Sequence, residues 1–259
     1  MEKNEKVKLL FLGTGTSQGV PLIACPCEVC QSEDSHDKRL RSSVVFQAGG
    51  KNIVIDTGPD FRQQMLRSGI KSISAVLFTH EHKDHVAGLD DVRAYNYILK
   101  KPIDVYVHQR VLEALKREFS YIFDGSNYPG IPKINVHDLK NESFLLDGIK
   151  VTPILAYHYK LPVFGFRIGD ITYLTDANRI EDEEKEKIKG SKILVLNALR
   201  RESHISHFTL EEAIAMSREL KPEKTYFTHI SHQMGKHREV SEELPENIFL
   251  AYDGLEIEA

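Results

Sequence analysis

The sequence predicts a layered α/β protein in which helices cover the faces of β-sheets. Short apolar runs rich in Val, Ile and Phe, mostly closed by Gly, Asp or Thr, alternate with segments of helical periodicity along the whole chain. Such alternation is typical of sheets flanked by helices. The 259 residues, 41% of them apolar, could form one large domain or two fused halves, and we predict a single domain over residues 1–259.

Each element is predicted from its own pattern. The predicted strands are KLLFLGT (8–14), SSVVFQ (42–47), NIVIDT (52–57), AVLFT (75–79), IDVYVH (103–108), ITYLT (171–175) and KILVLNA (192–198). The predicted helices are DFRQQMLRSG (60–69), AGLDDVRAYNYIL (87–99), RVLEALKREF (110–119), EDEEKEKIKG (181–190) and TLEEAIAMSREL (209–220). Thr209 and Glu212 have the spacing of a capping box, which predicts where the last of these helices begins.

Charge and cysteine content indicate the compartment and the class of partner. The formal net charge is −4, so a long-range attraction to nucleic acid or to an anionic membrane is not indicated. The N-terminal segment lacks the apolar core of a signal peptide, and no apolar run is long enough to span a bilayer. Three cysteines are an odd number and do not suggest a disulfide framework. We therefore expect a cytoplasmic protein without membrane contact.

The string HEHKDH, residues 80–85, is the strongest chemical signal in the chain. Two histidines at i and i+2 on an extended loop can present their imidazoles to one ion. Asp84 and His85 lie where the chain turns into a helix and can point at a second ion. Chance would place such a string in only about one or two of a thousand sequences of this histidine content. The string therefore predicts a metal site.

Two neighbouring metals need further ligands from other strand ends, including a bridging carboxylate. Asp176 ends the run ITYLT, His158 follows VTPILAY, and His229 follows the run YFT. Each residue alone would more often be an ordinary loop residue than a ligand. Together with the HEHKDH string they predict a binuclear site.

The order of these motifs resembles the metallo-β-lactamase fold in its binuclear hydrolase branch. The strings GTGTSQGVP, CPCEVC, RLRSS, IDTGPDFR and THISHQ narrow the resemblance to the PhnP-type phosphodiesterases of the carbon-phosphorus lyase pathway and their relatives. The resemblance extends from about Leu9 to Asp253. It implies an αββα four-layer sandwich and a metal-dependent hydrolase.

The resemblance also implies a ligand set. One metal would be held by His80, His82 and His158, the other by Asp84, His85 and His229, with Asp176 bridging them. Asp56 would support the HEHKDH loop without binding an ion. The ions would be Zn or Mn, since carboxylate and imidazole ligands accept several metals.

All three cysteines lie within CPCEVC, residues 25–30, which raises the question of a fourth ligand. The resemblance implies a structural zinc held by three thiolates and one imidazole, which we assign to Cys25, Cys27, Cys30 and His232. His36 is the local alternative, and a third possibility is that the thiols bind no metal. A site with four protein ligands has no open position and is therefore structural.

Two divalent ions with open positions lower the pKa of a shared water and clamp the oxygens of a displacement at phosphorus, which suits a phosphodiester. The resemblance places His207 where it would serve the leaving group, beside Asp84 as the other catalytic residue, and His204 is the competing choice. Asn197 departs from the Asp-Ala-Leu-Arg string expected in relatives, and this departure could alter the pH profile if the position tunes the catalytic histidine. Arg41, Arg200 and Arg201 are weaker candidates for phosphate contacts.

We therefore expect a phosphodiesterase acting on a small, possibly cyclic, phosphodiester or nucleotide. One alternative is a tRNA 3′-processing endonuclease of the same fold, but residues 100–148 offer only one modest loop and no basic cluster, so nucleic acid is not the expected partner. The other alternative is a non-catalytic metal-binding or carrier protein, which would not need His207. The resemblance also implies a homodimer, which no residue pattern tests.

Overall fold

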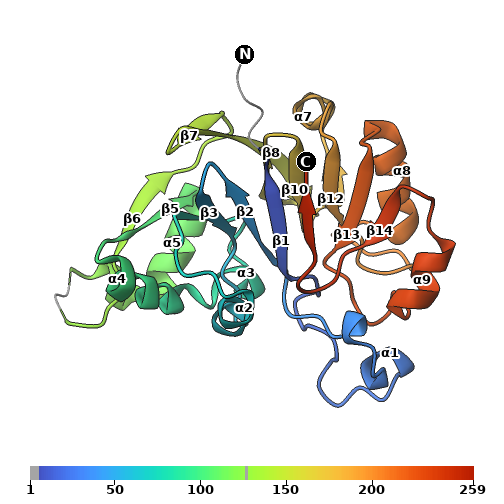
Figure 1. Ribbon diagram of the computed structural model, residues 1–259, viewed down its shortest axis with the longest axis horizontal. Coiled ribbons are helices and arrows are strands. Elements are labelled where there is room, and N and C mark those ends of the chain that lie inside the picture. Colours follow the sequence, from blue (N-terminus) through green and yellow to red (C-terminus); the bar gives the residue numbers. More distant parts are fainter. Residues whose placement is uncertain (1–5, 126–127) are drawn as a thin grey trace.

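The chain forms two β-sheets, as a computed structural model that describes residues 6–125 and 128–259 shows (Figure 1). Within those residues the first sheet has seven strands in the order β15-β1-β2-β3-β4-β5-β6. Their bounds are β15 Glu256–Glu258, β1 Lys8–Gly13, β2 Ser43–Ala48, β3 Lys51–Ile55, β4 Ala75–Leu77, β5 Ile103–Val107 and β6 Ile134–Asp138. Pairing is parallel from β3 to β6 and antiparallel among the remaining neighbours.

The second sheet has eight strands in the described residues, in the order β11-β8-β9-β10-β12-β13-β14, with β7 also paired to β8. Their bounds are β11 Arg179–Ile180, β8 Ile149–His158, β9 Leu161–Ile168, β10 Ile171–Leu174, β12 Ile193–Asn197, β13 Lys224–Thr228, β14 Ile248–Leu250 and β7 Phe144–Leu146. Pairing is parallel from β10 through β12 and β13 to β14.

Helices connect these strands. The α-helices are α1 Glu28–Gln31, α2 Phe61–Ser68, α3 Lys83–Val86, α4 Arg93–Leu99, α5 Gln109–Glu118, α6 Ser120–Phe123, α7 Asp182–Ile188, α8 Leu210–Leu220 and α9 His237–Glu243. The described residues also contain two 3₁₀ helices, η1 Ser35–Asp37 and η2 Leu89–Val92. The predicted capping box of α8 is confirmed, since Thr209 and Glu212 exchange both hydrogen bonds.

The predicted αββα sandwich is confirmed by the way successive strand residues divide between hydrophobic clusters. In β2, Val44 and Phe46 pack between the two sheets, whereas Val45 between them packs under the outer helices. In β12, Val195 packs between the sheets and Leu194 on the opposite face. Because strand side chains alternate between faces, a strand buried on both sides is apolar throughout. This burial explains the uninterrupted apolar runs.

The outer layers are helical. Residues of α2, α4 and α5 pack on the outer face of the first sheet, and residues of α7, α8 and α9 pack on the outer face of the second. Figure 1 shows these two groups on opposite sides of the paired sheets. Phe46 belongs instead to the layer between the two sheets. Burying a large apolar side chain such as this one contributes about 1.5–3 kcal/mol, so the layer between the sheets is a major source of stability.

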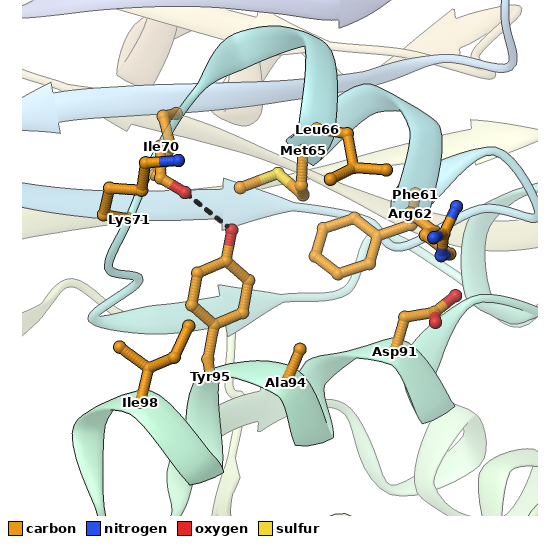
Figure 2. A pocket seen from close by; sticks show the side chains of 10 residues that line it. All are labelled: Phe61, Arg62, Met65, Leu66, Ile70, Lys71, Asp91, Ala94, Tyr95 and Ile98. Carbon is orange, nitrogen blue, oxygen red and sulfur yellow. Dashed lines mark hydrogen bonds between the residues drawn. The ribbon is translucent and has the colours of Figure 1, made fainter.

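One cavity lies within the outer layer itself. It has a volume of about 310 Å³ and is lined by α2, η2 and α4 residues that include Phe61, Met65 and Tyr95. Figure 2 shows the Tyr95 hydroxyl donating a hydrogen bond to the Ile70 carbonyl at 3.0 Å across one end of it. No histidine lines this cavity, so it does not belong to the predicted metal site. Among the described residues, no helix has the length and apolar character needed to cross a membrane.

Candidate metal centre

Three predicted ligands lie at the carboxyl ends of second-sheet strands that run in the same direction: His158 ends β8, Asp176 follows β10 and His229 follows β13. His80 comes from the first sheet, in the loop after β4. Ligand sites in α/β sheets form where such strand ends meet. The fold therefore brings together residues that are up to 149 positions apart in the sequence.

The loop after β4 is held close to the turn after β3. The Thr57 N–H donates to the His85 carbonyl at 2.8 Å. A side chain at Gly58 would bring a Cβ to 2.1 Å from the Asp84 carbonyl oxygen, so only glycine permits this approach. The glycine of the IDTGPD string therefore positions the HEHKDH loop.

One group of four ligand atoms forms around Asp176. The nearest oxygens of Asp84 and Asp176 lie 3.1 Å and 3.3 Å from His85 Nε2, and the other Asp176 oxygen lies 3.1 Å from His229 Nε2. All four ligand atoms lie within 4.8 Å of one another. These are the residues that the resemblance placed around one metal, together with the bridging carboxylate.

The histidines assigned to the other metal also converge. The ring centres of His80 and His82 are 4.6 Å apart, and that of His158 lies 5.9 Å from His80 and 5.1 Å from His82. The second compact group of ligand atoms, however, is His158, Asp176 and His207. His207 therefore lies beside the centre, although the sequence analysis did not count it as a ligand.

Hydrogen bonds from outside the cluster fix the orientation of four imidazoles. The Nδ1 atom of His80 contacts Thr79 Oγ1 at 2.9 Å, that of His85 contacts Asp56 Oδ2 at 2.7 Å and that of His158 contacts the Ser206 carbonyl at 2.9 Å. His229 Nδ1 lies 3.3 Å from Ser42 Oγ. With Nδ1 donating outward, Nε2 is left to accept a metal.

The same contacts test the prediction for Asp56. Besides His85, this carboxylate accepts hydrogen bonds from the Thr79 N–H at 2.9 Å and the Thr79 hydroxyl at 2.8 Å. Asp56 is fully buried and supports the HEHKDH loop, as expected. Its oxygens are occupied by the residues that it orients.

Three residues of the site have a left-handed backbone. Asp56, Asp176 and His229 have φ values of 63°, 58° and 56°, and each follows a strand. Such conformations cost on the order of 1–3 kcal/mol for a residue other than glycine and concentrate at functional sites. The turns direct these side chains toward the cluster.

The charges in the cluster favour a bound cation. Burial alone would raise the pKa of Asp176, but His229 and His85 lower it well below its usual value. Burial alone would lower the pKa of His85, but Asp84, Asp176 and Asp56 raise it well above its usual value. The carboxylates are therefore ionised, and a divalent ion can balance their negative charge in place of a proton.

The donor atoms fit a divalent metal. Among the described residues, His80 Nε2 and His207 Nδ1 are buried without a hydrogen-bond partner. Buried polar atoms are nearly always paired, so orphaned atoms that converge on ionised carboxylates indicate a missing partner. Nitrogen and oxygen donors suit Zn or Mn.

His207 and His204 differ in their surroundings. His207 is 7% exposed and its ring centre lies 4.4 Å from that of His158 and 4.9 Å from that of His229. His204 is more exposed, and its Nδ1 accepts a hydrogen bond from the Ser206 N–H at 3.3 Å. Burial is the main reason that the pKa of His207 is lowered, followed by His229. His207 does not cap α8, because Thr209 does.

The side-chain hydrogen bonds of Asn197 go to Ala177 and not to His207. Its side-chain oxygen accepts from the Ala177 N–H at 2.8 Å and its amide donates to the Ala177 carbonyl at 3.0 Å. An ionised aspartate could only accept and would lose the second bond. Asn197 therefore anchors the residue next to Asp176, and no hydrogen bond supports the suggested tuning of His207.

The three arginines considered for phosphate contacts already have protein partners. Arg41 pairs with Asp60 at 3.2 Å, Arg200 donates to Gln233 Oε1 at 2.9 Å and Arg201 pairs with Glu243 at 2.7 Å. These contacts account for the arginines without a substrate.

The cysteines gather with His232 rather than with His36. His232 Nδ1 lies 3.5 Å from Cys25 Sγ and 3.3 Å from Cys27 Sγ, and Cys30 completes the group. His232 and the Cys30 N–H lower the pKa of Cys27 to about 6, whereas burial raises the pKa of Cys30 to about 11.

His36 lies elsewhere. Its ring packs on Tyr252 with centres 4.2 Å apart, and its Nδ1 lies 3.2 Å from Asp34.

The cluster of Cys25, Cys27, Cys30 and His232 offers sulfur and nitrogen donors that suit zinc. It ties the segment of α1, visible at the foot of Figure 1, to the loop that carries His229.

Comparison with known proteins decides the family. Residues 51–230 match the model of the beta-lactamase superfamily domain. A crystal structure described as a new diphosphatase from the PhnP family is 42% identical, with a TM-score of 0.92 over 98% of this chain and 97% of that one. The chain belongs to the PhnP family of the metallo-β-lactamase superfamily. The resemblance inferred from the sequence is thus confirmed.

Two further proteins are similar to this PhnP-family protein. An octanoyltransferase of Porphyromonas gingivalis is 42% identical over 253 residues, which are 96% of this chain and 51% of that protein. The chain thus spans about half the length of this curated relative. Zn(2+)-bound PqqB from Methylobacterium extorquens is 21% identical with a TM-score of 0.77 over 96% of this chain and 99% of that one, which shows a shared fold.

Sequence reasoning missed the residues that hold the ligands in place. Ser206 and Ser42 contact His158 and His229, and Asn197 anchors the turn of Asp176. Ser42 lies within the RLRSS string, so that string could have identified it. The roles of Ser206 and Asn197 depend on contacts across the fold and have no local signal.

Proposed function

We propose that this PhnP-family protein is a metal-dependent phosphodiesterase that hydrolyses a small phosphodiester. The observation that carries the proposal is the convergence of His80, His85 and Asp176, with unpartnered imidazole nitrogens facing ionised carboxylates. Seven residues would hold two divalent ions: His80, His82, Asp84, His85, His158, Asp176 and His229.

The chain's own residues then have separate tasks. Bound divalent ions would polarise the phosphoryl group and lower the pKa of the attacking water. Asp56 and Ser206 hold His85 and His158 in the orientation that presents Nε2. His207 lies at the edge of the cluster and donates a hydrogen bond or proton to the departing oxygen, which supports the leaving group.

A diphosphate is the second candidate substrate. The relative at 42% identity is described as a diphosphatase, and it matches nearly the whole chain. A diphosphate ester, like a phosphodiester, has a phosphorus atom with a substituted oxygen as leaving group. Both substrates would use the same residues, so a direct comparison is needed.

Turnover of a defined substrate panel tests the proposal. Metal-loaded protein is expected to hydrolyse bis(p-nitrophenyl) phosphate, with p-nitrophenyl phosphate as the monoester control. A diphosphate diester, an octanoyl thioester and a precursor tRNA with a 3′ extension represent the other chemistries. No turnover of the diester and the diphosphate by metal-loaded protein would refute the phosphoryl assignment. Preferred cleavage of the thioester or the tRNA would replace it.

We also propose that Cys25, Cys27, Cys30 and His232 hold a structural zinc. A Cys27→Ser variant is expected to lose about one zinc ion per chain, because serine replaces a thiolate that suits zinc. Its melting temperature should fall by several degrees, since a structural ion stabilises the folded state. Elemental analysis and thermal unfolding measure the two effects.

The two candidate histidines provide the control for that measurement. His232→Ala should lose the same ion, whereas His36→Ala should retain it, because His36 packs on Tyr252 outside the cluster. Retention of all zinc in Cys27→Ser and His232→Ala would show that the thiols bind no metal. Loss of zinc in His36→Ala alone would move the fourth ligand to that residue.

A further inference from the structure

A basic pocket lies away from the metal centre, at the edge of the first sheet. It occupies about 510 Å³ between α4, the start of β5 and the segment before β6. Figure 1 shows α4 and β6 together at one end of the molecule. Its lining includes Arg93, Asn96, Tyr97, Lys100, Lys101 and Lys133. Its size is that of ordinary small-ligand sites.

The side chain of Asn96 assembles this pocket from two separate segments. Its amide nitrogen donates to the Lys101 carbonyl at 3.0 Å and to the Lys133 carbonyl at 2.9 Å. Its oxygen accepts from the Lys133 N–H at 2.8 Å. Lysines that are 32 positions apart are thereby fixed side by side. The expectation that residues 100–148 contain no basic cluster is therefore wrong, because the cluster forms only in the folded chain.

The charges of the pocket are unbalanced. Four of the lining residues are cations and none is acidic, although the whole protein has a net charge of −4. Arg93 pairs with Asp90 at 3.2 Å, but in the described part of the chain no carboxylate forms an ion pair with Lys100, Lys101 or Lys133. Like charges held together repel one another, and a bound anion removes that repulsion.

An aromatic ring stands beside these cations. Tyr97 is 64% exposed, and a Cβ added at Gly130 would lie 3.4 Å from its hydroxyl. Exposed tyrosine rings next to basic side chains form stacking platforms for nucleobases. We propose that this pocket binds a nucleoside polyphosphate, with the phosphates on Lys100, Lys101 and Lys133 and the base on Tyr97. The site is separate from the metal centre, and none of the predicted metal ligands lines it.

A charge-reversal variant tests the proposal by binding rather than by turnover. Calorimetric titration of metal-loaded wild-type protein with ATP should show binding that a Lys101→Glu/Lys133→Glu variant weakens about a hundredfold. The hydrogen bonds of Asn96 to these two lysines involve only their backbone groups, so the pocket should remain folded. Phosphodiester turnover should be unchanged, which separates this pocket from the metal centre. Equal ATP affinity in wild type and variant would overturn the proposal.

Matched controls identify the chemistry that is recognised. Lys116→Glu/Lys150→Glu makes the same charge change at two exposed lysines outside the pocket and should leave ATP affinity unchanged. Tyr97→Ala should weaken ATP binding but not the binding of inorganic triphosphate. Equal affinity of wild type for ATP and triphosphate would overturn the stacking role, and tighter binding of a single-stranded oligonucleotide than of ATP would overturn the small-ligand assignment.

Discussion

An Asp176→Asn variant is expected to hydrolyse a phosphodiester about a thousandfold more slowly than the wild type, which corresponds to about 4 kcal/mol of transition-state stabilisation. Both oxygens of Asp176 face imidazoles, with distances of 3.3 Å to His85 Nε2 and 3.1 Å to His229 Nε2. Asparagine keeps the shape of the side chain but removes its charge, so the bridging position would hold cations poorly. Elemental analysis should therefore show loss of metal from the binuclear centre.

The substitution is mild for the fold, so the comparison is informative. Asp176 has a φ of 58°, and asparagine is among the residues that tolerate this left-handed conformation. Asp170→Asn makes the same change at the other end of β10, where Asp170 pairs with Lys192 at 2.7 Å, and should leave turnover unchanged. An Asp176→Asn variant with normal rate and full metal content would remove this carboxylate from the mechanism.

Burial on both faces made strands such as β2 visible in the sequence. Residues such as Val44 and Val45 are both apolar because each faces a different core layer, so β2 is visible as an unbroken apolar run. The terminal strand β15 has the sequence EIE and pairs with β1 from the far end of the chain. Its two glutamates give it no apolar run, so only the pairing reveals it.

The helix predicted over residues 87–99 is divided in the structure. A 3₁₀ segment, Leu89–Val92, precedes α4, which starts at Arg93. Gly88 lies before this segment, and a Cβ there would approach the Gly58 carbonyl to 2.2 Å. The tight packing against the turn after β3 sets the path of the chain here, and helical periodicity contains no information about that contact.

The candidate site was more predictable than its supports because the residues that converge in it lie in specific local strings. HEHKDH places four candidates within six residues, and Asp176, His158 and His229 follow the runs ITYLT, VTPILAY and YFT. Asn197, by contrast, contacts Ala177, which is twenty positions away, and Asn96 contacts Lys133 at a separation of 37. Such contacts depend on which strands become neighbours. The sequence therefore indicated the residues that converge in the candidate metal centre but not the residues that hold them in position.

A His207→Ala variant is expected to retain its metals and lose between a hundredfold and ten-thousandfold in turnover. The imidazole lies against the cluster, with Nδ1 3.9 Å from Asp176, and is buried without a hydrogen-bond partner there. A group that serves only the leaving oxygen acts in the chemical step, so kcat should fall more than KM changes. Steady-state kinetics with a substrate that has a poor leaving group measures this effect most directly.

Three companion measurements distinguish a leaving-group residue from a metal ligand. His204→Ala should keep nearly the full rate, because His204 contacts Ser206 and is more exposed. His207→Gln retains a hydrogen-bond donor and should recover part of the rate, and p-nitrophenolate, which needs little protonation, should reduce the deficit of His207→Ala. Loss of metal in His207→Ala would instead make His207 a ligand, consistent with its position beside His158 and Asp176. A rate loss confined to His204→Ala would transfer the leaving-group role to that residue.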